Sequence, residues 1–203
     1  MRREVDEDTQ IRSGGGGPGE LRRDARRNRL SVLRAAREVF RDRGLEATVH
    51  NVARRAGVSA ATVHRRFPGR DALVEDLAEH AAGELTERFA ELARTVPADL
   101  ALERALRLVA AEAVATRMCA PDHRERFPER ARALDEHVHR ELHRLLADAQ
   151  EGGLVSAEIT AQDLRLATSA LTAAAAAEPD PERAGQSAQR LVTHFLRSFR
   201  GRG

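Results

Sequence analysis

One stretch of the sequence decides the fold: TVHNVARRAGVSAATVHRRF, residues 48–67. Thr48 and Ser59 are placed to cap two short helices, because their hydroxyl oxygens can accept from the unpaired amides of a first turn. Ala53 is small where the helices cross, and Gly57 permits the positive φ of a tight turn. Apolar residues fill the seam between the helices: Val52, Ala56, Val58, Val63 and Phe67. The stretch therefore predicts a helix-turn-helix.

The second of these helices has a small and polar outer face. That face carries Ala60, Ala61, Thr62, His64 and Arg65, with Arg66 beside them. A recognition helix has this character, and its N-terminal end enters the major groove, which is about 12 Å wide. Arg65 or Arg66 could donate two hydrogen bonds to guanine, worth about 1–3 kcal/mol of discrimination. A solvated face is the alternative for such arginines, above all for Arg54 and Arg55.

Charge distinguishes the N-terminal part of the chain from the rest. Residues 1–70 hold 17 arginines and 9 acids, whereas residues 71–203 hold 17 arginines and 23 acids. The stretch 21–70 alone holds 14 arginines and 4 acids. Because nucleic acid attracts a basic segment and repels an acidic one, only the N-terminal part is expected to sit on it.

Helical periodicity continues outward from this stretch without strand alternation and predicts an all-α protein of about nine helices. Residues 1–24 are expected to be a disordered extension. Residues 25–70 form the expected three-helix, helix-turn-helix DNA-binding domain, and residues 71–203 a larger helical bundle. The expected helices lie at about 26–43, 49–56, 60–66, 70–95, 99–118, 122–130, 131–151, 161–177 and 181–199.

Residues 22–29, RRDARRNR, form a basic run that leads directly into the first helix of the domain. Such a run could be a flexible arm that reaches phosphate or the minor groove. Nonspecific solvation is the alternative.

Several classes of protein and site are not indicated. No apolar run approaches the roughly 20 residues that span a bilayer, and the charged N-terminus lacks the apolar region of a secretory signal. The single Cys119 excludes an internal disulfide, so a cytoplasmic location is expected. No glycine-rich phosphate loop or nucleophile elbow is found, so neither an enzyme nor a cofactor is expected. His139 and His143 have the spacing of a metal pair, but no third ligand is suitably placed, so no metal is expected.

The sequence around the helix-turn-helix resembles the tetracycline-repressor (TetR) family of transcriptional regulators. The likeness runs in register through residues 32–36, 40–44, 47–49, 52–59, 62–63 and 67–73. Three positions depart from the family pattern: His64 stands where tyrosine is usual, Arg66 where histidine is common, and Arg70 where lysine is usual. His64 can still reach a phosphate, but the aromatic packing of a tyrosine is lost there, which puts the family role of this position in doubt.

The resemblance implies roles for the matched positions. Thr48 and Arg70 would bind phosphates from helix N-termini, while the second helix would face bases and sugar-phosphate. The implied DNA-binding set is Thr48, His50, Ser59, Ala60, Ala61, Thr62, His64, Arg65, Arg66 and Arg70. The resemblance also implies a homodimeric repressor that binds a palindromic double-stranded operator and is released by a small-molecule effector. A ligand-independent DNA-binding dimer, whose body only sets the half-site spacing, is the alternative.

The last two predicted helices each carry an apolar face with small residues, which permits close helix approach. These faces are candidates for a four-helix interface between two copies, although an intrachain core would have the same pattern. They consist of Leu164, Ala167, Leu171 and Ala174, then Ala184, Ala188, Leu191, Phe195 and Phe199.

The middle helices would enclose the effector pocket that the resemblance implies. Its candidate residues are Leu106, Ala110, Ala113, Arg117, Phe127, Leu134, Val138, Leu142 and Thr168. Plain core is the alternative for each of them. Arg117 could pair an anionic ligand, or merely Asp122 or Glu125.

Overall fold

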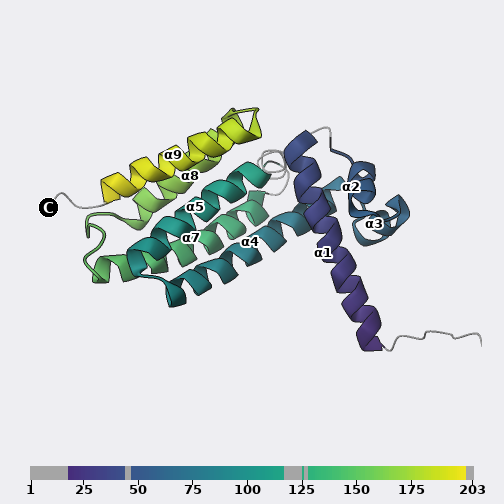
Figure 1. The fold of residues 1–203 in the computed structure, drawn as a ribbon, viewed down its shortest axis with the longest axis horizontal. Helices are drawn as coiled ribbons and strands as arrows, with labels where there is room; N and C mark the ends of the chain where they lie inside the picture. Colours follow the sequence, from purple (N-terminus) through teal and green to yellow (C-terminus); the bar gives the residue numbers. More distant parts are fainter. Residues whose placement is uncertain (1–17, 44–46, 117–124, 126–127, 200–203) are drawn as a thin grey trace, which may run out of the picture.

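The computed structural model describes residues 18–43, 47–116, 125 and 128–199. Eight helices account for almost all of these residues, and no strand occurs among them, which confirms the all-α prediction (Figure 1). The helices are α1 (Pro18–Arg43), α2 (Val49–Ala56), α3 (Ala60–Arg66), α4 (Arg70–Thr95), α5 (Ala98–Thr116), α7 (Pro128–Glu151), α8 (Ala161–Ala177) and α9 (Pro181–Phe199).

The helix α1 begins earlier than the sequence predicted, at Pro18 instead of Arg26, so residues 18–24 are helical and not disordered. Proline suits a first helical position, and Glu20 in the first turn complements the helix dipole. The basic run that follows consists largely of arginine and alanine, which are good helix formers. The predicted disorder of residues 1–17 lies outside the described residues.

The helix α7 is also longer than predicted, because it runs without a break from Pro128 to Glu151. The expected boundary between residues 130 and 131 is therefore wrong. Pro128 and Glu129 provide the start signals that the sequence prediction placed later. Of the expected short helix at 122–130, residues 122–124, 126 and 127 lie outside the described part of the chain.

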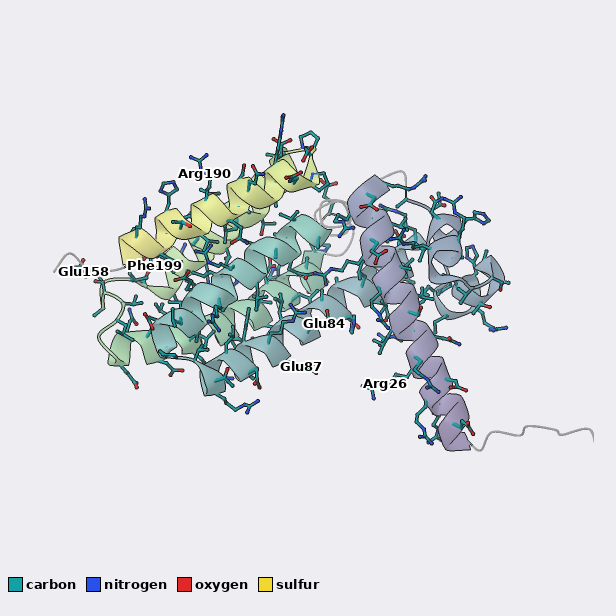
Figure 2. All side chains as sticks on the ribbon, viewed as in Figure 1. Arg26, Glu84, Glu87, Glu158, Arg190 and Phe199 are labelled. Atoms are coloured by element: carbon teal, nitrogen blue, oxygen red, sulfur yellow. The ribbon has the colours of Figure 1, made fainter. Side chains whose placement is uncertain are left out.

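A first hydrophobic core joins α1, α2, α3 and the first turns of α4 as far as Leu77; we call this unit the head. Its centre consists of side chains with less than 2% of their surface exposed: Leu33, Phe40, Val52, Val63 and Leu73, with Phe67 at 2%. The N-terminal half of α1 projects beyond this core (Figure 1). Arg26 lies on that projecting part, whereas Glu84 and Glu87 lie on α4 (Figure 2).

A second core occupies the remaining helices, which we call the body. The helix α5 is central to it, because it packs against α4, α7, α8 and α9 (Figure 1). Leucines and alanines from these helices fill the core, among them Leu102, Leu106, Leu142, Leu146, Leu164 and Leu171.

The head and the body are joined by α4 and by a cluster of charges. Arg37 of α1 forms an ion pair with Glu112 of α5 and lies 3.6 Å from the carboxylate of Glu84 on α4. Burial raises the pKa of Glu112 above its ordinary value, while the neighbouring Arg37 acts in the opposite direction. Arg37, a residue of the other unit, therefore offsets part of the cost of burying this carboxylate.

Two glycines provide a matched test of the turn between α2 and α3. Gly57 has a φ of 70°, whereas Gly83 lies inside α4, and an added Cβ would meet nothing within 4 Å at either position. We expect Gly57→Ala to lower the free energy of unfolding by about 1–2 kcal/mol, because alanine resists the left-handed conformation. Gly83→Ala should raise it by about 0.5–1 kcal/mol, because it removes the entropy cost of a helical glycine. Urea denaturation followed by circular dichroism measures both, and equal effects would contradict the account.

Candidate nucleic-acid interface

Side-chain caps set the geometry of α2 and α3. The Thr48 hydroxyl accepts from the Asn51 amide at 3.2 Å, and the Thr48 amide donates to the Asn51 side chain at 3.2 Å. The Ser59 hydroxyl accepts from the Thr62 amide at 3.1 Å. Between them Gly57 adopts the left-handed conformation, and the Val58 amide donates to the Ala53 carbonyl at 3.0 Å. The caps and the turn that the sequence predicted are all confirmed.

The close contact of the two helices separates buried from exposed residues. Val52 and Val63 are fully buried, as is Ala53 at 2% exposure. The predicted DNA-binding residues on α2 and α3 are left at the surface, at the end of the molecule away from the body (Figure 1). Those that are exposed are Thr48, His50, Ser59, Ala61, His64, Arg65 and Arg66, while Ala60, Thr62 and Arg70 are half-buried.

Two of the half-buried residues have intramolecular partners that the sequence did not reveal. The Thr62 hydroxyl lies 2.8 Å from the Ser59 hydroxyl. The guanidinium of Arg70 lies over the ring of Phe40, 5.4 Å from its centroid. Phe40 and Arg70 are far apart in sequence, so no local pattern could indicate this contact. Arg70 therefore ties the start of α4 to α1, whether or not it also reaches a phosphate.

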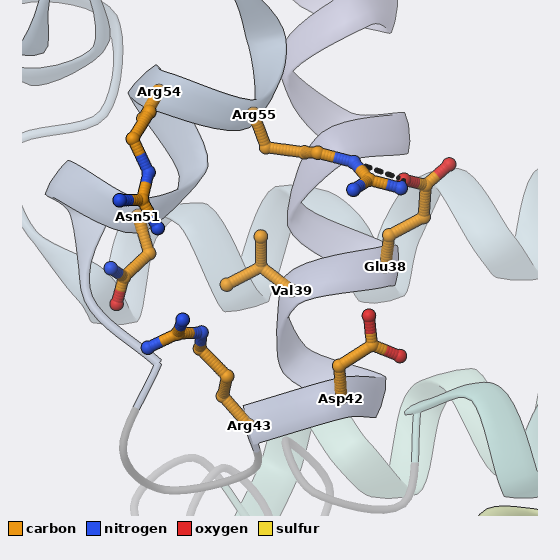
Figure 3. Close-up of a pocket in the computed structure, with 7 residues that line it drawn as sticks. All are labelled: Glu38, Val39, Asp42, Arg43, Asn51, Arg54 and Arg55. Atoms are coloured by element: carbon orange, nitrogen blue, oxygen red, sulfur yellow. Dashed lines mark hydrogen bonds and ion pairs between the residues drawn. The ribbon is translucent and has the colours of Figure 1, made fainter.

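A polar depression between α1 and α2 was not predicted. Its lining residues are Glu38, Val39, Asp42, Arg43, Asn51, Arg54 and Arg55 (Figure 3). Arg55 donates to the Glu38 carboxylate at 2.6 Å and Arg41 to the Asp42 carboxylate at 3.1 Å. Arg55 is thus part of an ion pair and not simply a solvated residue.

The comparisons with known proteins agree with this geometry. Residues 32–77 match the model for bacterial regulatory proteins of the tetR family, and these residues coincide with the head. A TetR transcriptional regulator of Streptomyces coelicolor is similar at 27% identity and a TM-score of 0.72, over 86% of this chain and 99% of that one. A TetR regulator of Mycobacterium vanbaalenii is similar at 26% identity and a TM-score of 0.69, over 89% and 99% of the two chains.

The chain is thus similar to TetR-family regulators, through its head and through its overall fold. FadR of Bacillus subtilis, solved in complex with stearoyl-CoA, shares the fold at 16% identity and a TM-score of 0.62, over 85% of this chain and 97% of that one. No curated protein matches the chain.

In the body, the candidate effector residues lie mostly in the core. Leu106, Ala110 and Leu142 are at most 1% exposed, whereas Ala113, Leu134 and Val138 are half-buried. Thr168, also one of the candidate effector residues, is polar and buried. Its hydroxyl lies 2.6 Å from His139 Nε2 and also contacts backbone carbonyls of α8. Arg117 and Phe127 lie outside the described residues.

The histidines of α7 connect helices. His139 contacts α8 through Thr168, and His137 Nε2 lies 2.9 Å from the Thr86 hydroxyl of α4, whereas His143 is exposed. Within the described ranges, no group of three or more side chains could hold a metal ion. Among the same residues, no helix is both long and apolar enough to cross a membrane.

The residues of the predicted dimer faces lie mostly in the core of their own chain. Leu164, Ala167, Leu171, Ala184 and Ala188 are at most 1% exposed and pack in the core of their own chain. Phe199 is 3% exposed, and Ala174, Leu191 and Phe195 are half-buried. For the buried members the intrachain alternative holds, because a side chain covered by its own protomer has no surface left for a second copy.

The two roles of Arg70 can be measured separately. Arg70→Ala should lower the free energy of unfolding by about 0.5–2 kcal/mol, because the contact with Phe40 is lost. Arg66→Ala, at an exposed position, should change it by less than about 0.5 kcal/mol. If Arg70 also binds a phosphate, its loss should lower the salt dependence of DNA binding by about one unit. Thermal denaturation without DNA measures the structural role of Arg70. Equal stability of the two variants would refute that role.

Proposed function

We propose that the chain is a transcriptional repressor that binds a palindromic operator as a homodimer and is released by a small-molecule effector. In this proposal the protein binds DNA and does not act as an enzyme. It binds that DNA in the cytoplasm. The observation that carries the proposal is the exposed polar and basic surface of α2 and α3, held by caps at the end of the molecule away from the acidic body.

The chemistry of this surface fits duplex DNA. Arg65 and Arg66 are exposed at the end of α3, where a guanidinium can form two hydrogen bonds with guanine. The exposed Thr48 lies at the start of α2, where the helix dipole favours a phosphate. One helix of seven residues reads few bases, so specific binding needs a second copy about one DNA turn away.

The outer face of α8 is the surface we propose for dimerisation. Leu166 is 64% exposed, which is the largest exposure of any large apolar side chain in the described chain. Ala170, Ala173 and Ala177 continue its row at helical spacing and are half-buried or exposed. Small residues around a single leucine allow two helices to approach closely across a two-fold axis.

Effector release would use the body and the joint to the head. Thr168 and His139 offer polar atoms beside an apolar core, as a site for a mainly apolar ligand requires. FadR of Bacillus subtilis, which shares the fold, was solved in complex with stearoyl-CoA. A ligand-independent dimer remains the alternative, and a thermal-shift screen separates the two: stabilisation by a small molecule supports effector release, and its absence across acyl-CoA and other apolar ligands supports the alternative.

Selection of bound fragments from genomic DNA tests the operator proposal. We expect a two-fold symmetric site with half-sites about 34–36 Å apart, bound with salt-sensitive affinity. Arg65→Gln should relax the preference at one base pair of each half-site by about 1–3 kcal/mol. Arg104→Gln on the exposed surface of α5 is the control and should leave the preferred site unchanged. A wild-type protein without salt-sensitive affinity for any duplex would refute the function.

The dimer is tested by Leu166→Arg. The variant should raise the monomer–dimer Kd by roughly 100-fold. The two-fold axis repeats the substitution in both protomers, so the interface loses two buried leucines, each worth about 1.5 kcal/mol or more. Leu154→Arg is the matched control, because Leu154 is also exposed, at 45%, but lies outside α8. Analytical ultracentrifugation measures both, and an unchanged Kd for Leu166→Arg would exclude the outer face of α8 as the interface.

A further inference from the structure

The α1–α2 depression holds more positive charge than its composition suggests. Its two acids, Glu38 and Asp42, already accept from Arg55 and Arg41 respectively. Among the described residues, no carboxylate pairs with the other two arginines of the lining, Arg43 and Arg54, and both are exposed. The charge that remains available in the depression is therefore that of two guanidiniums.

The arrangement of these side chains brings donors together. Arg43, the last residue of α1, and Arg54, on α2, both project toward the side of the depression where Asn51 lies (Figure 3). Like charges repel, so a shared surface of two guanidiniums is stabilised most by an anion between them. The planar donors of arginine match the oxygens of a phosphate, with which they form paired hydrogen bonds.

The position of the depression points to the same chemistry. Asn51 caps the start of α2 through Thr48, so the depression adjoins the end of the helix where backbone amides and the dipole favour negative charge. The segment of residues 21–70, which contains all of these side chains, is strongly basic. These three features concern different atoms and agree on an anionic ligand.

We propose that Arg43 and Arg54, with the side-chain amide nitrogen (Nδ2) of Asn51 beside them, bind one phosphate group in the α1–α2 depression. The favoured source is the operator backbone next to the phosphate at Thr48, so this source rests on the function proposed above. A free phosphate or the phosphate of a small metabolite offers the same chemistry. Arg43 and Arg54 would then position the head on DNA without reading its sequence, since phosphate contacts fix register and carry no base information.

The test compares two double variants with the same loss of charge. Arg43→Gln/Arg54→Gln removes the available guanidiniums. Arg41→Gln/Arg55→Gln removes two arginines from the same two helices, α1 and α2. These arginines already donate to carboxylates. Glutamine keeps a high helix propensity, and circular dichroism checks that both variants retain their helices.

The first readout is the salt dependence of binding to the selected operator. With one phosphate bound per protomer, the first variant should lower the slope of log K against log salt by about 0.9 per protomer, and affinity should fall by at least roughly tenfold at low salt. The control variant should change the slope by less than half as much. Equal changes in the two variants would overturn the operator backbone as the source, because they would reflect charge alone.

The second readout is a titration with inorganic phosphate, followed by the arginine side-chain signals in nuclear magnetic resonance. Saturable binding to wild type and to the control, but not to Arg43→Gln/Arg54→Gln, supports the site. If phosphate binds while the operator slope is unchanged, the source is a free phosphate. Failure of both readouts overturns the proposal even if operator binding persists. A wild type that binds phosphate but no duplex overturns the proposed function and leaves the phosphate site standing.

Discussion

The close crossing of α2 and α3 is the constraint on which the head depends. Val63 of α3 is fully buried and Ala53 of α2 is 2% exposed, so small apolar side chains are buried where the two short helices pack together. Gly57 makes this approach possible, because its φ of 70° reverses the chain in one residue. With Val63 turned inward, helical geometry leaves Arg65 and Arg66 outside. The orientation of the charged surface is thus a consequence of a contact between small apolar residues.

A second constraint acts at the joint between the head and the body. The side chain of Arg37 extends from the head and pairs with Glu112 of α5. Burial raises the pKa of Glu112, and Arg37 acts in the opposite direction. Glu84 and Arg88 of α4 act on the same carboxyl group, so three helices meet in one electrostatic cluster. The pair is partly buried, with the two side chains 32% and 15% exposed, so it contributes little net stability although separating its partners costs free energy. Such a joint restricts the angle between head and body more than it stabilises either of them.

The sequence predicted local features well because local rules produce them. The caps at Thr48 and Ser59 and the left-handed Gly57 gave helix ends that agree with the structure. The start of α1 was missed because the glycine-rich stretch before Pro18 and the dense charge after it resemble the composition of disorder. Dense charge does not prevent a helix when the residues are good helix formers and a folded helix continues from them.

Contacts between distant residues were beyond the reach of sequence patterns. An apolar face at helical spacing indicates that Leu164 and Leu171 are covered. The pattern is the same whether the covering surface belongs to the same chain or to a second copy. The structure resolves this ambiguity, because the buried faces of α8 and α9 meet each other and α5, which leaves Leu166 outside. The contact of Arg70 with Phe40 and the depression between α1 and α2 likewise depend on how helices pack and not on their own sequences.

The distribution of arginine partners also changes the meaning of net charge. A sum over residues 21–70 counts every arginine equally. In the structure Arg29 pairs with Asp76 of α4, Arg37 with Glu112 and Arg55 with Glu38. The acids that engage Arg29 and Arg37 lie outside that segment, so the sum overstates the charge that the head presents to a polyanion. DNA would meet the field of the arginines that remain at the surface, which lie on α3, on α2, at the end of α1 and along its projecting N-terminal half. Where the charge lies therefore carries more of the argument for nucleic-acid binding than how much of it there is.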